Sequence, residues 1–181
     1  MGNGVSTPLE ILAKCSAPLL LTGPHACLAH TSPEDVSYNE CECAIDAGTE
    51  AQITEHFARN EWNIVYRTPF FAKFRLLSTG TPVIKVLFLD ATTFGKLRED
   101  SFERVFGGCK MRVPSLIHVV AMKLQTIKNE PDRETDDLPE ILSLLRINQG
   151  HWTAEELDTV CKRFGPRGIY LRIAQRLAAI G

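Results

Sequence analysis

The sequence predicts an α+β protein in which a sheet domain, residues 1–114, packs with a helical bundle, residues 115–181, as one compact unit. Two observations predict this division. Strand-like runs lie before Pro114, and from Ser115 onward apolar residues recur at helical spacing with short polar connections. With 181 residues, of which 44% are hydrophobic and 23% charged, the chain is long enough to bury such a core.

The elements before residue 46 lead into a short strand. Thr7–Cys15 has a capping threonine, a proline in its first turn and apolar residues at helical spacing, which predicts a helix. Leu19–Gly23 then approaches a glycine turn, and small residues follow at His25–His30. Ser, Pro, Glu, Asp and Asn dominate Thr31–Asn39, which indicates a loop that enters a strand at Glu40–Ile45.

A helix and a meander of three strands are predicted next. Thr49–Asn60 begins with a capping threonine and carries apolar residues on one face, as a helix does. Strand-like runs follow at Trp62–Arg67, Phe70–Leu77 and Val83–Leu89. The glycine and proline of Ser78–Pro82 predict a turn between the last two runs, so we expect the three strands to lie side by side.

Helical patterns dominate after Asp90. We predict a helix at Phe94–Phe106 and a short strand at Lys110–Val113, which Pro114 ends. Four more helices are predicted at Ser115–Lys128, Glu134–Asn148, Ala154–Phe164 and Arg167–Ile180.

Lys85 lies inside an apolar run that should be a buried strand. Because burying an ammonium group costs several kcal/mol unless an anion meets it, the chain should supply a carboxylate nearby. Glu40 and Glu42 are candidates, since residues at i and i+2 of a strand share one face. Two acids with a third carboxylate on a neighbouring strand would be typical of a metal-dependent phosphoryl-transfer site, but here the third group is a lysine. Either Lys85 pairs with Glu40 or Glu42, or it reaches solvent from an edge strand.

Composition excludes several classes of partner and site. The formal charge of −2 gives no general attraction to nucleic acids or anionic membranes. No apolar run reaches the roughly 18 residues of a membrane span, and residues 1–16 lack the pattern of a secretion signal, so we expect a cytoplasmic protein. The six cysteines are scattered along the chain, and in a cytoplasmic protein we expect them to be free thiols. Cys41 and Cys43 lack the second pair that a zinc site would need.

Three segments resemble the nucleotidyltransferase superfamily, in particular the small bacterial branch related to the abortive-infection toxin AbiEii. VLFLDATTF, MRVPSLIHVVAMKLQTIKN and RETDDLPEILSLL are similar to its strand, its "V-P-S-L-x-x-L-I-A-x-K-L" helix and its "R-x-x-K-D-L-x-D-I" helix. The resemblance extends from about Leu19 to Leu145. It implies a mixed sheet flanked by helices with a C-terminal helical bundle.

The resemblance assigns site residues unevenly. Gly23, followed by a proline without an N–H, matches the glycine turn that meets nucleotide phosphates. Glu40 and Glu42 match the metal-binding Asp-x-Asp pair, each carboxylate being one methylene longer, whereas Lys85 stands where the third aspartate is found. The helix lysine and helix aspartate of the family correspond to Lys123 and Asp137, and Asp136 falls where a lysine is common.

Two functions therefore compete. In the first, Glu40 and Glu42 hold Mg²⁺, Gly23 and Lys123 contact the phosphates of a nucleoside triphosphate, and the nucleotide passes to an unknown acceptor. In the second, the site is degenerate and the protein binds or regulates a protein partner in a toxin–antitoxin or defence setting. Ordinary alternatives also stand: solvated strand acids for Glu40 and Glu42, a solvent-exposed ammonium for Lys123, and a solvated helix start for Asp137.

Overall fold

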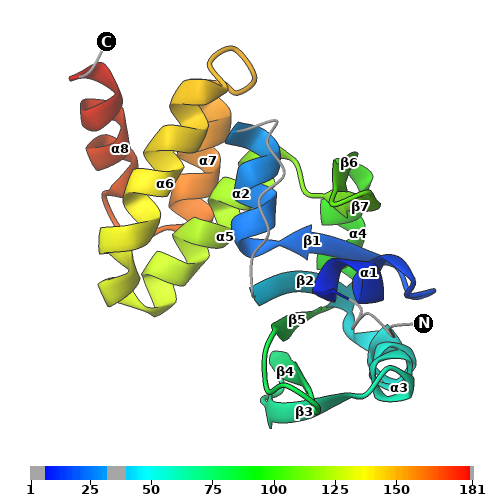
Figure 1. The fold of residues 1–181 in the computed structure, drawn as a ribbon. Coiled ribbons are helices and arrows are strands. Elements are labelled where there is room, and N and C mark those ends of the chain that lie inside the picture. Colours follow the sequence, from blue (N-terminus) through cyan, green and yellow to red (C-terminus); the bar gives the residue numbers. More distant parts are fainter. Residues whose placement is uncertain (1–6, 32–39, 180–181) are drawn as a thin grey trace. The chain divides into compact units, whose positions relative to one another are not determined.

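The computed structural model describes residues 7–31 and 40–179, and the chain divides into two compact units (Figure 1). Within the described residues, the first unit contains residues 7–26 and 40–114 and the second contains residues 27–31 and 115–179. The predicted loop at Thr31–Asn39 lies outside the described residues from position 32 onward.

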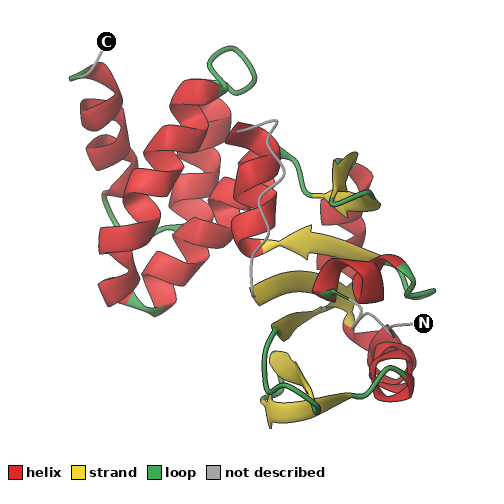
Figure 2. Ribbon diagram, in the orientation of Figure 1, coloured by secondary structure: helices red, strands yellow, loops and turns green. Residues whose placement is uncertain are grey.

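The first unit is built on a five-stranded mixed sheet, coloured yellow in Figure 2. Its strand order is β1-β2-β5-β4-β3, with bounds Leu19–Thr22, Glu40–Asp46, Val83–Leu89, Phe71–Leu76 and Trp62–Arg67. β2 and β5 are parallel, and the other neighbours are antiparallel. The predicted α+β class, the mixed sheet and the meander of β3, β4 and β5 are confirmed.

Helices cover both faces of this sheet. α3 (Glu50–Arg59), preceded by a 3₁₀ turn at Ala47–Thr49, packs on one face, where the rings of Phe57 and Phe74 lie 4.6 Å apart. α4 (Ala91–Glu99) packs on the other face and buries two apolar side chains against Leu20. The face under α4 is the one that carries Glu42, since side chains alternate along β1 and β2.

Three sequence predictions in this unit are corrected. The predicted helix Phe94–Phe106 is wrong: α4 ends at Glu99, and Phe102–Phe106 is a strand, β6, that pairs with β7 (Cys109–Val113) in a separate two-stranded sheet. Leu19–Thr22 is a strand rather than only an approach to a turn. The small residues that follow form α2 (Gly23–Thr31), and α1 spans Pro8–Ala13.

In its described residues, the second unit is entirely helical outside its loops. It contains the end of α2, α5 (Leu116–Asn129), a 3₁₀ turn at Pro131–Arg133, α6 (Glu134–Ile147), α7 (Ala154–Phe164) and α8 (Ile169–Ala178), which are labelled in Figure 1. Apolar side chains of α5 and α6 form its core, including Leu124, Ile127, Ile141 and Leu145. No helix within the described ranges is long and apolar enough to cross a bilayer.

Candidate functional site

A row of polar side chains crosses one face of the sheet in the first unit. Thr22 of β1 lies opposite Glu42 of β2, and Glu42 lies opposite Lys85 of β5. Lys85 in turn lies opposite Lys73 of β4. Because directly opposed residues point to the same face, these four side chains form one continuous row across four strands.

The centre of the row is an ion pair between Lys85 and Glu42. Lys85 Nζ lies 2.9 Å from Glu42 Oε2, and the two side chains are 29% and 19% exposed. The Thr22 hydroxyl donates a hydrogen bond of 3.1 Å to Glu42 Oε1. The edge-strand alternative is wrong, because β5 lies between β2 and β4.

Gly23 brings the start of α2 against Glu42. Its φ of +61° lies in the left-handed region, which favours glycine. A Cβ at this position would lie 3.0 Å from Glu42 Cβ and 3.5 Å from Glu42 Oε1. The glycine thus allows both the turn out of β1 and the close approach of α2 to the carboxylate.

The residues of the row do not fit a Mg²⁺ site. Both oxygens of Glu42 already have partners, and one partner is an ammonium group that would repel a divalent cation. Glu40 shares this face but is exposed and lies opposite Val83, which offers no ligand atom. Among residues 7–31 and 40–179, no three His, Cys, Asp or Glu side chains are grouped as metal ligands.

The neighbouring cysteines of β2 offer no replacement ligands. Burial, assisted by the charge of Glu40, raises the pKa of Cys41 to about 12, so its thiol stays protonated at neutral pH. Cys41 and Cys43 alternate with Glu40 and Glu42 and therefore point to the opposite face. The six cysteines, all of which lie within the described residues, form no disulfide.

Asp90 is occupied in capping a helix. Its Oδ1 accepts a 2.9 Å hydrogen bond from the Thr93 N–H, and its Oδ2 accepts one of 2.6 Å from the Thr93 hydroxyl. These hydrogen bonds lower the pKa of Asp90 below its ordinary value. The acid at the end of β5 is thus the N-cap of α4 and does not replace the third carboxylate.

Lys123 and Asp137 lie in the second unit and bind each other. Lys123 Nζ is 2.9 Å from Asp137 Oδ1 and also pairs with Glu140. Arg133 Nη2 lies 3.4 Å from the same oxygen of Asp137. Burial alone would lower the pKa of Lys123, but nearby Cys27, Glu140 and Asp137 raise it above its ordinary value. Neither ordinary alternative holds: Asp137 is 3% and Lys123 14% exposed at the side chain.

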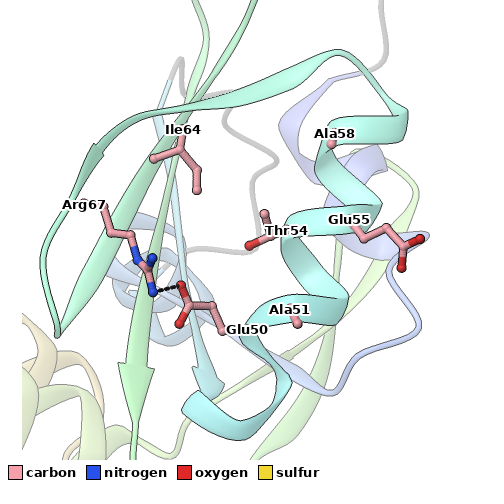
Figure 3. Close-up of a pocket in the computed structure, with 7 residues that line it drawn as sticks. All are labelled: Glu50, Ala51, Thr54, Glu55, Ala58, Ile64 and Arg67. Carbon is pink, nitrogen blue, oxygen red and sulfur yellow. Dashed lines mark ion pairs between the residues drawn. The ribbon is translucent and has the colours of Figure 1, made fainter.

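A groove on the opposite face of the sheet has the wrong charge for a phosphate. It lies between α3 and the edge strand β3 (Figure 3), and the lining residues are Glu50, Ala51, Thr54, Glu55, Ala58, Ile64 and Arg67. Its one basic group, Arg67, already pairs with Glu50 at 2.7 Å. Two carboxylates against one paired guanidinium would repel an anion.

Comparison with solved structures identifies the fold. The antibiotic-resistance factor ANT(2'')-Ia aligns with a TM-score of 0.65 at 11% identity over 92% of both chains. The chain has the nucleotidyltransferase fold. A nucleotidyltransferase-like antigen from Paracoccidioides brasiliensis aligns with a TM-score of 0.54 at 12% identity, over 86% of this chain and 82% of that one. The lincomycin-bound adenylyltransferase LnuA gives 0.51 at 13%, over 72% and 87%. No protein-family model and no curated protein matches the sequence.

Two members of the polar row, Thr22 and Lys73, are not predicted from the sequence. Thr22 ends β1, which the sequence indicated only as an approach to a turn. Lys73 alternates with buried residues in the run FAKFRL, and this alternation was the available signal that it shares a face with Lys85.

Proposed function

We propose that this protein binds a nucleotide on the Glu42 face of a nucleotidyltransferase fold but does not carry out Mg²⁺-dependent nucleotidyl transfer. The observation that carries the proposal is the ion pair of 2.9 Å between Lys85 and Glu42. In this account the ammonium group of Lys85 takes the place of the metal and neutralises the carboxylate permanently.

The arrangement around the pair supports binding without metal chemistry. Gly23 still opens a helix beside Glu42, and the N–H groups of a helix's first turn, other than that of a proline such as Pro24, have no acceptor within the helix itself. Glu42 is held by both neighbouring strands and has no free oxygen to offer an incoming cation. In this proposal the chain retains the glycine turn that faces the phosphates, and the carboxylates that would bind the metal are altered.

The structural neighbours support the choice of a nucleotide as the ligand. LnuA is an adenylyltransferase, whereas the Paracoccidioides antigen is described only as nucleotidyltransferase-like. The same fold therefore occurs in a protein with a stated transferase activity and in one without. The proposal includes a relation to the AbiEii branch. In its regulatory form, the nucleotide-binding protein acts by contacting a protein partner in a toxin–antitoxin or defence setting.

An active nucleotidyltransferase is the second candidate. Glu40, Glu42 and Gly23 lie on one face and at one end of the sheet, as the family motif requires, which favours this candidate. It requires Lys85 to leave Glu42 when substrate enters.

Calorimetry separates the two candidates. The protein is titrated with each of the four nucleoside triphosphates, once in EDTA and once with Mg²⁺, alongside the Glu42→Gln variant. The proposal predicts binding in EDTA that Glu42→Gln does not weaken. Binding that requires Mg²⁺ and is lost in Glu42→Gln supports the active enzyme instead, and no binding in either buffer rejects both.

A further inference from the structure

Two lysines lie opposite each other in the polar row, on the half of the sheet away from α2, and only one of them is neutralised. Lys73 and Lys85 are direct partners in the antiparallel β4–β5 pair. Directly opposed residues have Cβ atoms about 4.5–5.5 Å apart, and like charges at this separation destabilise a sheet. Glu42 neutralises Lys85, but among the described residues no ion pair involves Lys73. The ammonium group of Lys73 therefore remains as an excess positive charge directly opposite another lysine.

The same face carries a further cation on β4. Arg75 lies two residues after Lys73 on β4, so it shares the face, and it is exposed. Three cations, Lys73, Arg75 and Lys85, share this face with three carboxylates of β2. Glu42 pairs with Lys85, Asp46 caps the turn that follows β2, and exposed Glu40 lies two strands away from Arg75, so Lys73 and Arg75 form a local excess of positive charge on β4. The local excess is positive although the chain as a whole has a formal charge of −2.

Aromatic rings border the lysines. Phe71 precedes Lys73 by two residues on β4, and Lys85 Nζ lies 5.3 Å from the centre of its ring. Tyr66 of β3 lies opposite Lys73 and is 54% exposed, with its ring 5.5 Å from that of Phe71. A half-exposed aromatic ring beside cations is the combination that binds a stacked base and a phosphate together.

We infer that Lys73, with Lys85 and Arg75, binds the phosphates of a nucleotide without a metal ion, and that Tyr66 stacks on its base. This inference rests on the proposed function and names the groups that perform it. An anion placed between Lys73 and Lys85 relieves the repulsion between them, and Lys85 can share its protons between that anion and Glu42 because an ammonium group has three donors.

The test is calorimetric titration in EDTA with ATP, adenosine and tripolyphosphate. The variants are Lys73→Ala, Lys73→Arg and Tyr66→Ala, and the control is Lys110→Ala. Lys110 is also a strand lysine of the first unit, but it is exposed and lies on β7, outside the row. Lys73 is half-buried, so its replacement should leave the fold intact, which the unfolding temperature checks.

The inference predicts that Lys73→Ala weakens ATP about 10- to 100-fold, as loss of a charge-assisted hydrogen bond does. Lys73→Arg should retain binding within a few-fold, and Lys110→Ala should have no effect. Tyr66→Ala should weaken ATP but not tripolyphosphate, and adenosine should bind least well because it lacks the phosphates. Affinity should also fall as salt is raised.

Three results would overturn the inference, and they differ from those that reject the proposed function. ATP binding in EDTA that Lys73→Ala leaves unchanged removes Lys73 but keeps the nucleotide site. Equal effects of Tyr66→Ala on ATP and tripolyphosphate remove the stacking. Equal losses in Lys73→Ala and Lys110→Ala indicate attraction by overall charge alone. If the unchanged protein binds no ATP in any buffer, the proposed function itself fails.

Discussion

Replacement of Lys85 by methionine should destabilise the first unit, because it leaves Glu42 without its cation. The two side chains are 29% and 19% exposed, so their pair lies between two known limits. Exposed ion pairs contribute about 0–1 kcal/mol, whereas removal of one partner from a fully buried pair costs about 3–5 kcal/mol. The hydrogen bond from Thr22 stays in place and partly satisfies the carboxylate. We therefore expect Lys85→Met to lower the free energy of unfolding by about 2 kcal/mol.

A double-mutant cycle isolates this interaction. Glu42→Gln alone should also destabilise, and the double variant should be less destabilised than the sum of the two, with a coupling energy of about 1–2 kcal/mol. Lys110→Met, at an exposed strand lysine outside the row, is the control and should change stability by less than about 0.5 kcal/mol.

The assay must report on the first unit. The chain has two tryptophans: Trp62 lies buried in β3, and Trp152 lies in the second unit and donates to the Leu145 carbonyl oxygen. In a Trp152→Phe background, urea unfolding followed by fluorescence reports on Trp62. Agreement with far-UV circular dichroism checks two-state unfolding. A coupling energy of zero would refute the reasoning, since it would mean that Lys85 and Glu42 do not interact in solution.

Three other predictions concern positions around and beyond the row. Gly23→Ala should cost about 1–2 kcal/mol, because alanine is strained at a φ of +61° and its Cβ would meet Glu42; urea unfolding that matches the unchanged protein contradicts this. Gly165→Ala should lower stability by about 1–3 kcal/mol, since its Cβ would lie 2.5 Å from Ile169 Cγ2 and 2.9 Å from the Cys161 carbonyl oxygen; an unchanged melting temperature would show that α7 and α8 can move apart. Lys123 has a raised pKa in the folded state. Its charge therefore contributes fully to the free energy of unfolding below the unfolded-state pKa of about 10.4, and this contribution is lost as pH rises through the folded-state pKa. The stability difference between the unchanged protein and Lys123→Met should therefore shrink above about pH 10.5, and a difference that grows there would reverse the sign of the argument.

Local sequence patterns predicted much of the fold. The meander was visible because β4 and β5 alternate between buried and half-buried residues and a glycine–proline turn separates them. The helix predicted at Phe94–Phe106 failed because FERVF carries apolar residues that suit either period over so short a run. The segment forms a strand because it pairs with β7, and this contact cannot be predicted from the residues of the segment itself.

The candidate site was predictable in part for the same reason. A lysine in an apolar strand requires a nearby anion, and Glu40 and Glu42 of β2 are acids that share one strand face, so the pattern predicts the ion pair without knowledge of the strand pairing. Which acid it meets depends on the β2–β5 register, which places Glu42 rather than Glu40 opposite Lys85. Register is a property of the assembled sheet, so this choice could not be derived from the sequence, and the alternation in FAKFRL indicates the face of Lys73 but not its partner on β5.

The central claim is that Lys85 occupies the cation position of the fold. Titration with Mn²⁺, followed by the electron paramagnetic resonance of the free ion, tests it most directly on the unchanged protein, Lys85→Asp, and Lys85→Asp combined with Glu42→Gln. We predict that the unchanged protein binds no Mn²⁺ at Glu42. Lys85→Asp should gain a Mn²⁺ site, because two carboxylates then face each other across β2 and β5. Adding Glu42→Gln to Lys85→Asp should remove that site. Mn²⁺ binding by the unchanged protein that Glu42→Gln abolishes would contradict the account.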